Sequence, residues 1–202
     1  MAPLGPGVDH YVPMRWLAQW FMRIRGWELT GIGELPKKFV ALGVPHTSNW
    51  DFVAFLAVIS RFKVAGRAIG KDSLVSGRFG GFMRRMGVIP VNRDHPGGLV
   101  NQMVDEFNAA DEMALIIAPE GTRSARSHWK SGFYRIAHAA DVPVVLAYID
   151  YTRKEAGFGK IVELTGKVRE DMDRIREFYA TRRPAGRFPE LASQIRLEME
   201  GA

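Results

Sequence analysis

Several absences limit what this chain can be. The 202-residue sequence contains no cysteine, so it forms no disulfide and suits a reducing compartment. No apolar run approaches the roughly 20 residues that span a bilayer. The segment Met1 to Gly7 lacks the basic start and apolar centre of a signal peptide. We therefore expect a cytoplasmic protein that does not cross a membrane by itself.

The sequence also lacks the marks of several functional classes. No His, Asp and Glu cluster has metal-binding spacing, so we predict no metal and no bound cofactor. No Gly-x-Ser-x-Gly turn is present, so a protein nucleophile is not expected. Repeats, low-complexity tracts and linkers are absent too, and the length suits one domain over residues 1–202.

Apolar runs and helical patterns alternate through the middle of the chain. This alternation predicts an α/β fold with a central, mostly parallel sheet flanked by helices. The expected strands are 27–32, 38–44, 63–69, 87–91, 113–118, 142–149 and 161–168, and the expected helices are 13–25, 49–60, 71–76, 79–86, 97–110, 131–140, 171–183 and 187–199.

The segment His46-Thr47-Ser48-Asn49-Trp50-Asp51 joins a buried strand to a helix. Within one helix, residues five apart diverge by about 140°, so His46 must precede the helix if its imidazole is to meet Asp51. A carboxylate that accepts one imidazole N–H leaves the other nitrogen able to take a proton. The pair can therefore form a general base, although Asp51 could also be an ordinary helix cap.

Two other strand ends deliver polar residues. Gly87 to Arg93 is a short apolar strand that closes on Arg93, and Ala118 to Ser124 follows the apolar run from Met113. Pro119 removes a ladder donor, while Gly121 permits close approach of backbone to a ligand. Since ligands bind beyond strand ends in such sheets, these stretches predict one shared site.

The stretches occur in an order that resembles the glycerolipid acyltransferase family, of the small bacterial lysophosphatidic acid acyltransferase type. His46 to Asp51 matches that family's HxxxxD motif. The other matching stretches are Gly87 to Arg93, Ala118 to Ser124 and Asp141 to Val145, with Lys71 to Leu74 and Trp129 to Gly132 as spacers. The resemblance covers residues 39–148.

The resemblance implies transfer of an acyl group from acyl-CoA or acyl carrier protein to a lysophospholipid hydroxyl, most simply that of 1-acylglycerol-3-phosphate. His46 would be the base and Asp51 would hold its tautomer. The substrate-binding residues would be Arg93, Glu120, Gly121, Thr122 and Arg123. Asn49, Lys71 and Lys130 are candidates for supporting contacts, although both lysines could be ordinary surface residues. His128 is the one rival histidine, because it lies close to the third motif.

Two prolines depart from the family pattern and leave the acceptor open. Pro45 stands before the histidine where the family has asparagine, and Pro90 interrupts the second motif. A lyso-ornithine lipid, an inositol mannoside or another glycolipid is an alternative acceptor. A non-catalytic lipid-binding or carrier-binding module and a thioesterase-like hydrolase are alternatives of other classes.

The helix expected at 13–25 carries an apolar stripe beside three arginines. Its members are Val12, Trp16, Leu17, Trp20, Phe21 and Ile24. Such a stripe suits a membrane interface, or equally a core-packing helix. From Arg61 to Arg93 eight basic residues face one acidic residue, a net charge of +7 against +6 for the whole chain. We expect anionic lipids of the membrane surface or acyl carrier protein as partners and, without a recognisable module, no nucleic acid.

Overall fold

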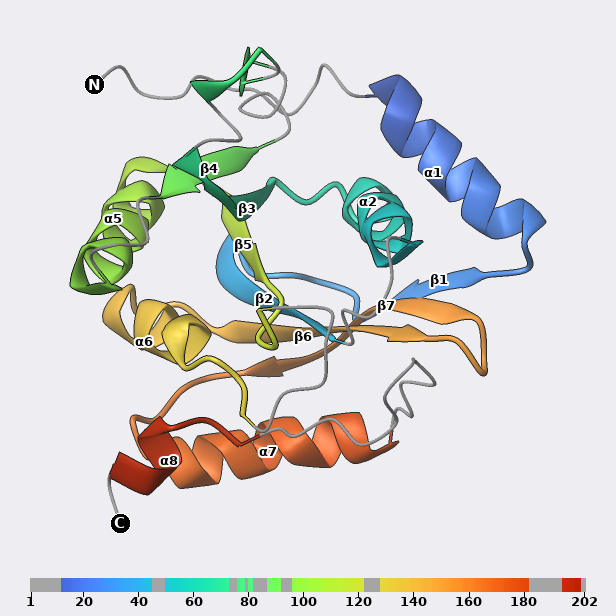
Figure 1. Ribbon diagram of the computed structural model, residues 1–202. Coiled ribbons are helices and arrows are strands. Elements are labelled where there is room, and N and C mark those ends of the chain that lie inside the picture. Colours follow the sequence, from blue (N-terminus) through green and yellow to red (C-terminus); the bar gives the residue numbers. More distant parts are fainter. Residues whose placement is uncertain are drawn as a thin grey trace.

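The structure, a computed structural model, describes residues 12–44, 50–72, 76–78, 80–81, 87–91, 96–121, 128–181 and 194–200. Seven strands in these ranges form one sheet in the order β1-β7-β6-β2-β5-β3-β4 (Figure 1). The strands are β1 Glu28–Gly31, β2 Lys38–Val44, β3 Gly66–Lys71, β4 Val88–Val91, β5 Met113–Ile117, β6 Val144–Asp150 and β7 Glu155–Val162. The helices are α1 Val12–Ile24, α2 Trp50–Arg61, α5 Pro96–Ala109, α6 Gly132–Ala139, α7 Val168–Thr181 and α8 Leu197–Glu200.

Five neighbouring strands, β6, β2, β5, β3 and β4, run parallel. Only the edge formed by β7 and β1 runs the other way, because β7 pairs antiparallel with β6 and β1 parallel with β7. The expected α/β fold with a mostly parallel sheet and an N-terminal amphipathic helix is therefore confirmed.

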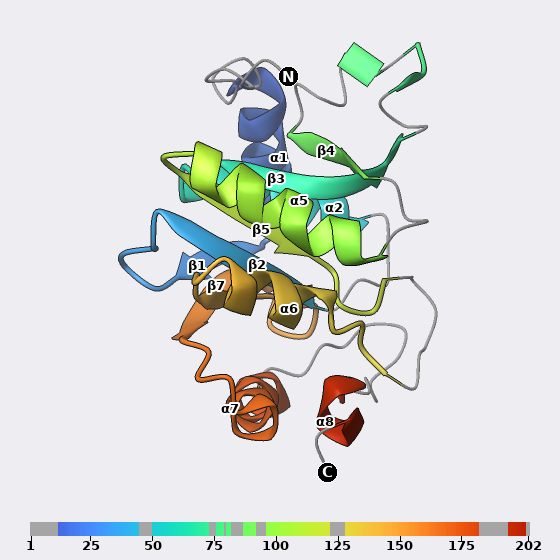
Figure 2. The ribbon, with the colours of Figure 1, turned by 90° about the vertical axis from the view of Figure 1, so that its left-hand side faces the viewer.

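Helices cover both faces of the sheet, and the strand residues alternate between two cores. Val40, Leu42 and Val44 of β2 face the core formed with α5, α6 and α7. Phe39 and Ala41 face the other core, formed with α1 and α2. Figure 2 shows α5 and α6 in front of the sheet and α1 and α2 behind it. A strand buried on both faces reads as a continuous apolar run, which is why β2 could be predicted closely.

The last strand differs from its prediction. A strand was expected over 161–168, but β7 spans Glu155–Val162 and follows β6 after a short turn. Gly157 and Gly159 lower the strand propensity of this segment, and so disguise it. Gly157 is required by packing, because a Cβ there would lie 1.6 Å from the Thr30 carbonyl oxygen of β1. The glycine allows β1 to pair at the sheet edge.

Other boundaries moved or lie outside the described residues. Lys71 is the last residue of β3 and does not begin a helix. Most of the short helices expected at 71–76 and 79–86 lies outside the described residues. Of the terminal helix expected over 187–199, the structure describes α8 at its end, where Glu198 accepts from Arg176 at 2.8 Å.

A buried carboxylate fixes the start of α7. Asp171 is fully buried and accepts hydrogen bonds from the Tyr134 hydroxyl at 2.7 Å and from the Thr165 hydroxyl and N–H at 2.8 and 2.9 Å. Arg174 completes the group as an ion pair. Burial alone would raise the pKa of Asp171, but the hydrogen bonds from Tyr134, Thr165 and Arg174 outweigh it and hold that pKa below its ordinary value.

We predict that Asp171→Asn lowers the free energy of unfolding by about 3 kcal/mol at pH 7, because a neutral amide replaces the buried carboxylate that accepts hydrogen bonds from Tyr134 and Thr165. A carboxyl group whose pKa is lower in the folded state stabilises the protein above its unfolded pKa of about 3.9, and this stability is lost as pH falls through the folded pKa. Urea unfolding of both proteins between pH 7 and pH 3 measures the difference. A difference that stays constant across this range would contradict the proposed ionisation.

Candidate active site

The motif segments follow strands that end at the same edge of the sheet. β2, β4, β5 and β6 are parallel, so their carboxyl ends, Val44, Val91, Ile117 and Asp150, meet there. The fourth matching stretch, Asp141 to Val145, leads into the opposite end of β6. The chain thus brings three of the four motifs to the edge where α/β proteins bind ligands.

Asp51 occupies the first turn of α2 and is only 3% exposed. A carboxylate there gains from the positive end of the helix dipole. Tyr151 directly follows β6, and its hydroxyl donates a hydrogen bond to Asp51 Oδ1. Asp51 is therefore a buried charge held by the structure around it rather than a solvated surface residue.

Sequence reasoning missed Tyr151. The residue lies 100 positions from Asp51 and belongs to none of the four matching stretches. The available signal was its place directly after an apolar strand, the same signal that singled out Arg93. Asp150 precedes it and is also buried, accepting hydrogen bonds from the backbone N–H groups of Thr152 and Arg153 at 3.0 and 2.9 Å.

In the turn after β5, backbone hydrogen bonds involve Gly121 and Pro119. The Gly121 backbone N–H donates to the Ala118 carbonyl at 3.0 Å, and the Lys130 N–H donates to the Pro119 carbonyl at 2.8 Å. Gly121 has φ +65°, a conformation that favours glycine. An added Cβ at this position would lie 2.7 Å from Lys130 Cε, so the lysine stem packs against the glycine.

Glu120 is 4% exposed and lies near the Tyr179 hydroxyl of α7. Burial raises the pKa of Tyr179 well above its ordinary value, and the negative charge of Glu120 raises it further. That hydroxyl lies 3.1 Å from the Leu42 carbonyl oxygen and 2.9 Å from that of Ala147. Tyr179 thereby ties α7 to β2 and β6.

The other predicted site residues are described only in part. His46, Asn49, Arg93, Thr122 and Arg123 lie outside the described residues. Lys71 ends β3 at the same edge as the motif segments, and Lys130 is exposed beside Gly121. The rival His128 is half-buried one residue before Trp129, which packs edge-on against Tyr179 at 5.9 Å between ring centroids.

The basic segment from Arg61 to Arg93 does not present all of its positive charges to solvent. Arg67 forms an ion pair of 2.9 Å with Glu106 of α5, a residue outside the counted segment. Arg61 lies over the Phe62 ring at 5.7 Å. Among the described residues of this segment, Arg61, Lys63 and Arg78 are exposed and provide its positive charge at the surface.

Helix α1 packs on α2 mainly through the face opposite to the exposed part of its apolar stripe. Ala18 and Met22 are buried against α2, and Gln19 donates to the Ser60 hydroxyl at 2.7 Å. Phe21 is half-buried and stacks on Trp50 at 5.4 Å. The exposed members of the stripe are Trp16 (61%), Leu17 (52%), Trp20 (51%) and Ile24 (58%).

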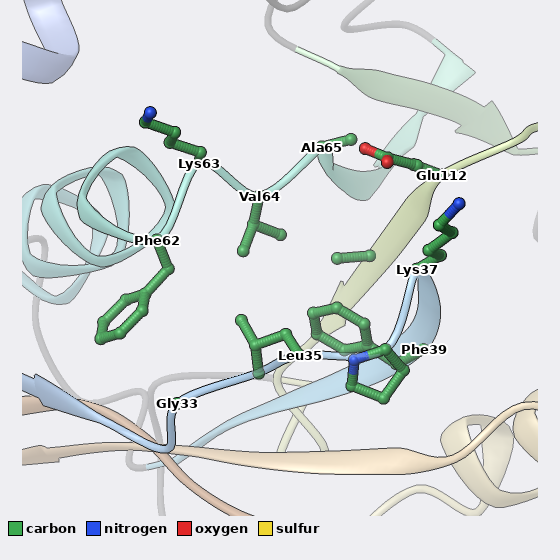
Figure 3. A pocket seen from close by; sticks show the side chains of 11 residues that line it. Gly33, Leu35, Lys37, Phe39, Phe62, Lys63, Val64, Ala65 and Glu112 are labelled. Atoms are coloured by element: carbon green, nitrogen blue, oxygen red, sulfur yellow. The ribbon is translucent and has the colours of Figure 1, made fainter.

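Two recesses lie beside the sheet, and they differ in whether they adjoin the edge where the carboxyl ends of the parallel strands meet. One of about 300 Å³ lies between α1, α2 and the turn after β6, and Phe21, Trp27, Trp50 and Tyr151 line it beside Arg25 and Lys154. The other, of about 190 Å³, lies at the opposite end of the sheet. Figure 3 shows Lys37 and Glu112 at one side of it and Phe62 at the other. Only the first recess includes a residue that contacts Asp51.

The described part of the chain contains neither a candidate metal site nor a candidate membrane-spanning helix. No group of three or more His, Asp or Glu residues there could hold a metal ion. No helix in those ranges is long and apolar enough to cross a bilayer.

Comparison with known proteins settles the class. The Acyltransferase family matches residues 28–150, which is more than half of the chain. The chain belongs to the acyltransferase family. The family expected from the four motifs is thus confirmed, and with it acyl transfer as the class of reaction.

One solved structure resembles this acyltransferase. It is the crystal structure of the 1-acyl-sn-glycerophosphate (LPA) acyltransferase PlsC from Thermotoga maritima, with a TM-score of 0.56 and 16% sequence identity over 83% of this chain and 78% of that one. At this identity the likeness supports the fold. A search of curated proteins found no match.

We predict that Gly121→Ala destabilises the protein by about 1–2 kcal/mol, since alanine is strained at positive φ and its Cβ meets the Lys130 stem. Chemical unfolding measures the loss. Lys130→Ala in the same chain removes the steric part but not the backbone part, so the double variant should recover only a portion of the stability. Full recovery would show that φ at this turn carries no strain.

Proposed function

We propose that this protein is an O-acyltransferase that moves a fatty acyl group from acyl-CoA or acyl carrier protein to a lysophospholipid hydroxyl. The most favoured acceptor is 1-acylglycerol-3-phosphate, which would give phosphatidic acid. The observation that supports this best is the buried Asp51 carboxylate in the first turn of α2, five residues after His46 and at the carboxyl edge of the sheet.

In this proposal His46 takes the proton of the acceptor hydroxyl as its oxygen attacks the thioester carbonyl. Asp51 accepts the other imidazole N–H and stabilises the imidazolium that forms. The tetrahedral intermediate then expels the thiolate, and the imidazolium returns the proton to sulfur. The ester C–O bond forms, the C–S bond breaks, and the base is restored without a covalent enzyme intermediate.

The acceptor phosphate would be held by cationic groups beyond the strand ends. Arg93 is suited to this, because a guanidinium binds phosphate through two parallel hydrogen bonds. Arg123, Thr122 and the Gly121 backbone would assist it, while Glu120 would orient the turn. Lys71 ends β3 and Lys130 packs on Gly121 in the turn after β5, so both lie close to strand ends that carry the proposed site.

We predict that His46→Ala and Asp51→Asn lower turnover about 10²- to 10⁴-fold, the usual contribution of a general base, without unfolding the protein. The assay combines labelled acyl-CoA or acyl carrier protein with a panel of lysolipids, and mass spectrometry identifies the product. Asp173→Asn, an exposed carboxylate on α7, is the matched control and should remain fully active.

Wild-type turnover in either site variant would sink this assignment. If lyso-ornithine lipid or a lysoglycolipid is acylated in place of lysophosphatidic acid, the chemistry stands and the acceptor changes. Binding without turnover would indicate a lipid-binding or carrier-binding module, and acyl-CoA hydrolysis without an acceptor would indicate a hydrolase.

The exposed face of α1 supports docking on the cytoplasmic surface of a membrane as part of this function. At about 100° per residue, Trp16, Leu17, Trp20 and Ile24 point away from the α2 contact. Trp50 (56%) and Phe52 (51%) add exposed aromatic area at the start of α2. Exposed Arg23 and Arg25 complement anionic headgroups, and tryptophan favours the interfacial region.

We predict that the double variant Trp16→Ser/Trp20→Ser binds vesicles containing phosphatidylglycerol about 10- to 100-fold more weakly, because it loses much of the apolar area available for insertion. Co-sedimentation measures the change. Arg23→Ala should weaken binding to anionic vesicles at low salt, whereas substitution of the exposed Arg169 on α7, Arg169→Ala, is its control. Unchanged binding of the tryptophan variant would refute the docking face.

A further inference from the structure

Asp51 receives a hydrogen bond from outside the matching motifs. The Tyr151 hydroxyl donates to its Oδ1 oxygen across 100 positions of sequence. A carboxylate that is 3% exposed has lost most of its hydration, so each protein donor strongly affects its orientation and its charge. Tyr151 therefore contacts the group on which the proposed base depends.

Tyr151 is itself held from two sides. Its ring packs edge-on against Trp27, with ring centroids 5.2 Å apart at 86°. The turn that carries it is fixed by buried Asp150, which accepts the N–H groups of Thr152 and Arg153. At the end of this turn Lys154 has φ +54°, and its carbonyl accepts the Glu28 N–H at 2.8 Å. These contacts leave the phenol little freedom to rotate away.

We propose that Tyr151 is a positioning residue that fixes the rotation of the Asp51 carboxylate for catalysis. This inference rests on the proposed function. A hydrogen bond to Oδ1 restricts rotation of the carboxylate, and thus the direction from which the carboxylate accepts an imidazole N–H. A carboxylate has about four acceptor sites, so accepting the phenol proton is compatible with accepting a second donor. Tyr151 acts through Asp51 and takes no proton in the reaction.

Tyr151 also lines the recess between α1 and α2, which suggests a rival role. As a wall of a substrate pocket it would contribute to binding, and its loss would raise KM. As a positioning residue it acts on the transition state through the base, and its loss would lower kcat at nearly constant KM. The two roles therefore separate kinetically.

The test compares Tyr151→Phe with wild type in the acyl-transfer assay, with the concentrations of acyl thioester and lysolipid varied separately. We expect kcat to fall about 10-fold or more, the effect of losing a hydrogen bond to a charged group, with both KM values within about twofold. Tyr134→Phe is the matched control, because it removes a phenol from buried Asp171, which lies outside the motif segments. It should keep wild-type kcat despite a lower Tm.

A double-mutant cycle tests the contact independently of activity. Tyr151→Phe should lower the Tm of the wild-type background but not of an Asp51→Ala background, where the phenol has lost its acceptor. A raised KM with unchanged kcat, wild-type kinetics in Tyr151→Phe, or equal Tm shifts in both backgrounds would each overturn the role. Wild-type protein that acylates no lysolipid would instead refute the proposed function, and the role of Tyr151 with it.

Discussion

The parallel pairing of β2 with both β5 and β6 is the constraint on which the site depends. The backbone ladder sets Leu42 beside Ile117 and Val44 beside Tyr148, so three chain segments leave the sheet at one edge. Tyr179 reinforces this arrangement from α7, because its hydroxyl lies within hydrogen-bonding distance of carbonyl groups of β2 and β6. Asp51, Glu120 and Tyr151 thereby belong to one edge although they are far apart in sequence.

In the described part of the chain, Tyr134 and Tyr151 each donate a hydrogen bond to a buried carboxylate, with different consequences. Asp171 accepts hydrogen bonds from Tyr134, Thr165 and Arg174, and these partners belong to α6, α7 and the segment between β7 and α7. Its burial ties elements together. Asp51 accepts from Tyr151 at the carboxyl edge of the sheet, beside the motif segments. The phenol–carboxylate hydrogen bond therefore stabilises the fold at Asp171 and supports the proposed base at Asp51. The difference follows from where each carboxylate lies relative to the sheet.

Much of the fold could be predicted because burial imposes simple patterns. The β2 run is apolar on both faces, and its boundaries were predicted as observed. The failure at β7 has a local cause: Gly157 is needed where β1 approaches, and glycine is a poor strand signal. The motifs single out Asp51 and Glu120 as candidates, whereas no motif includes Tyr151, whose contact with Asp51 depends on the β2–β6 register. Four members of the apolar stripe expected on α1, namely Trp16, Leu17, Trp20 and Ile24, are exposed, while Ala18 on the other face is buried in the core that includes α2.

The orientation of α1 connects the proposed membrane surface with the proposed chemistry. Trp50 is exposed and stacks on Phe21 of α1, while Asp51, the next residue, is buried. The carboxylate thus lies within one helical turn of the exposed apolar face. A lysolipid held at the interface by its acyl chain would present its polar end at that depth. An interfacial acceptor would then reach the base without leaving the membrane fully, which avoids the cost of exposing its chain to water. In this proposal the start of α2 would contribute both to docking and to catalysis.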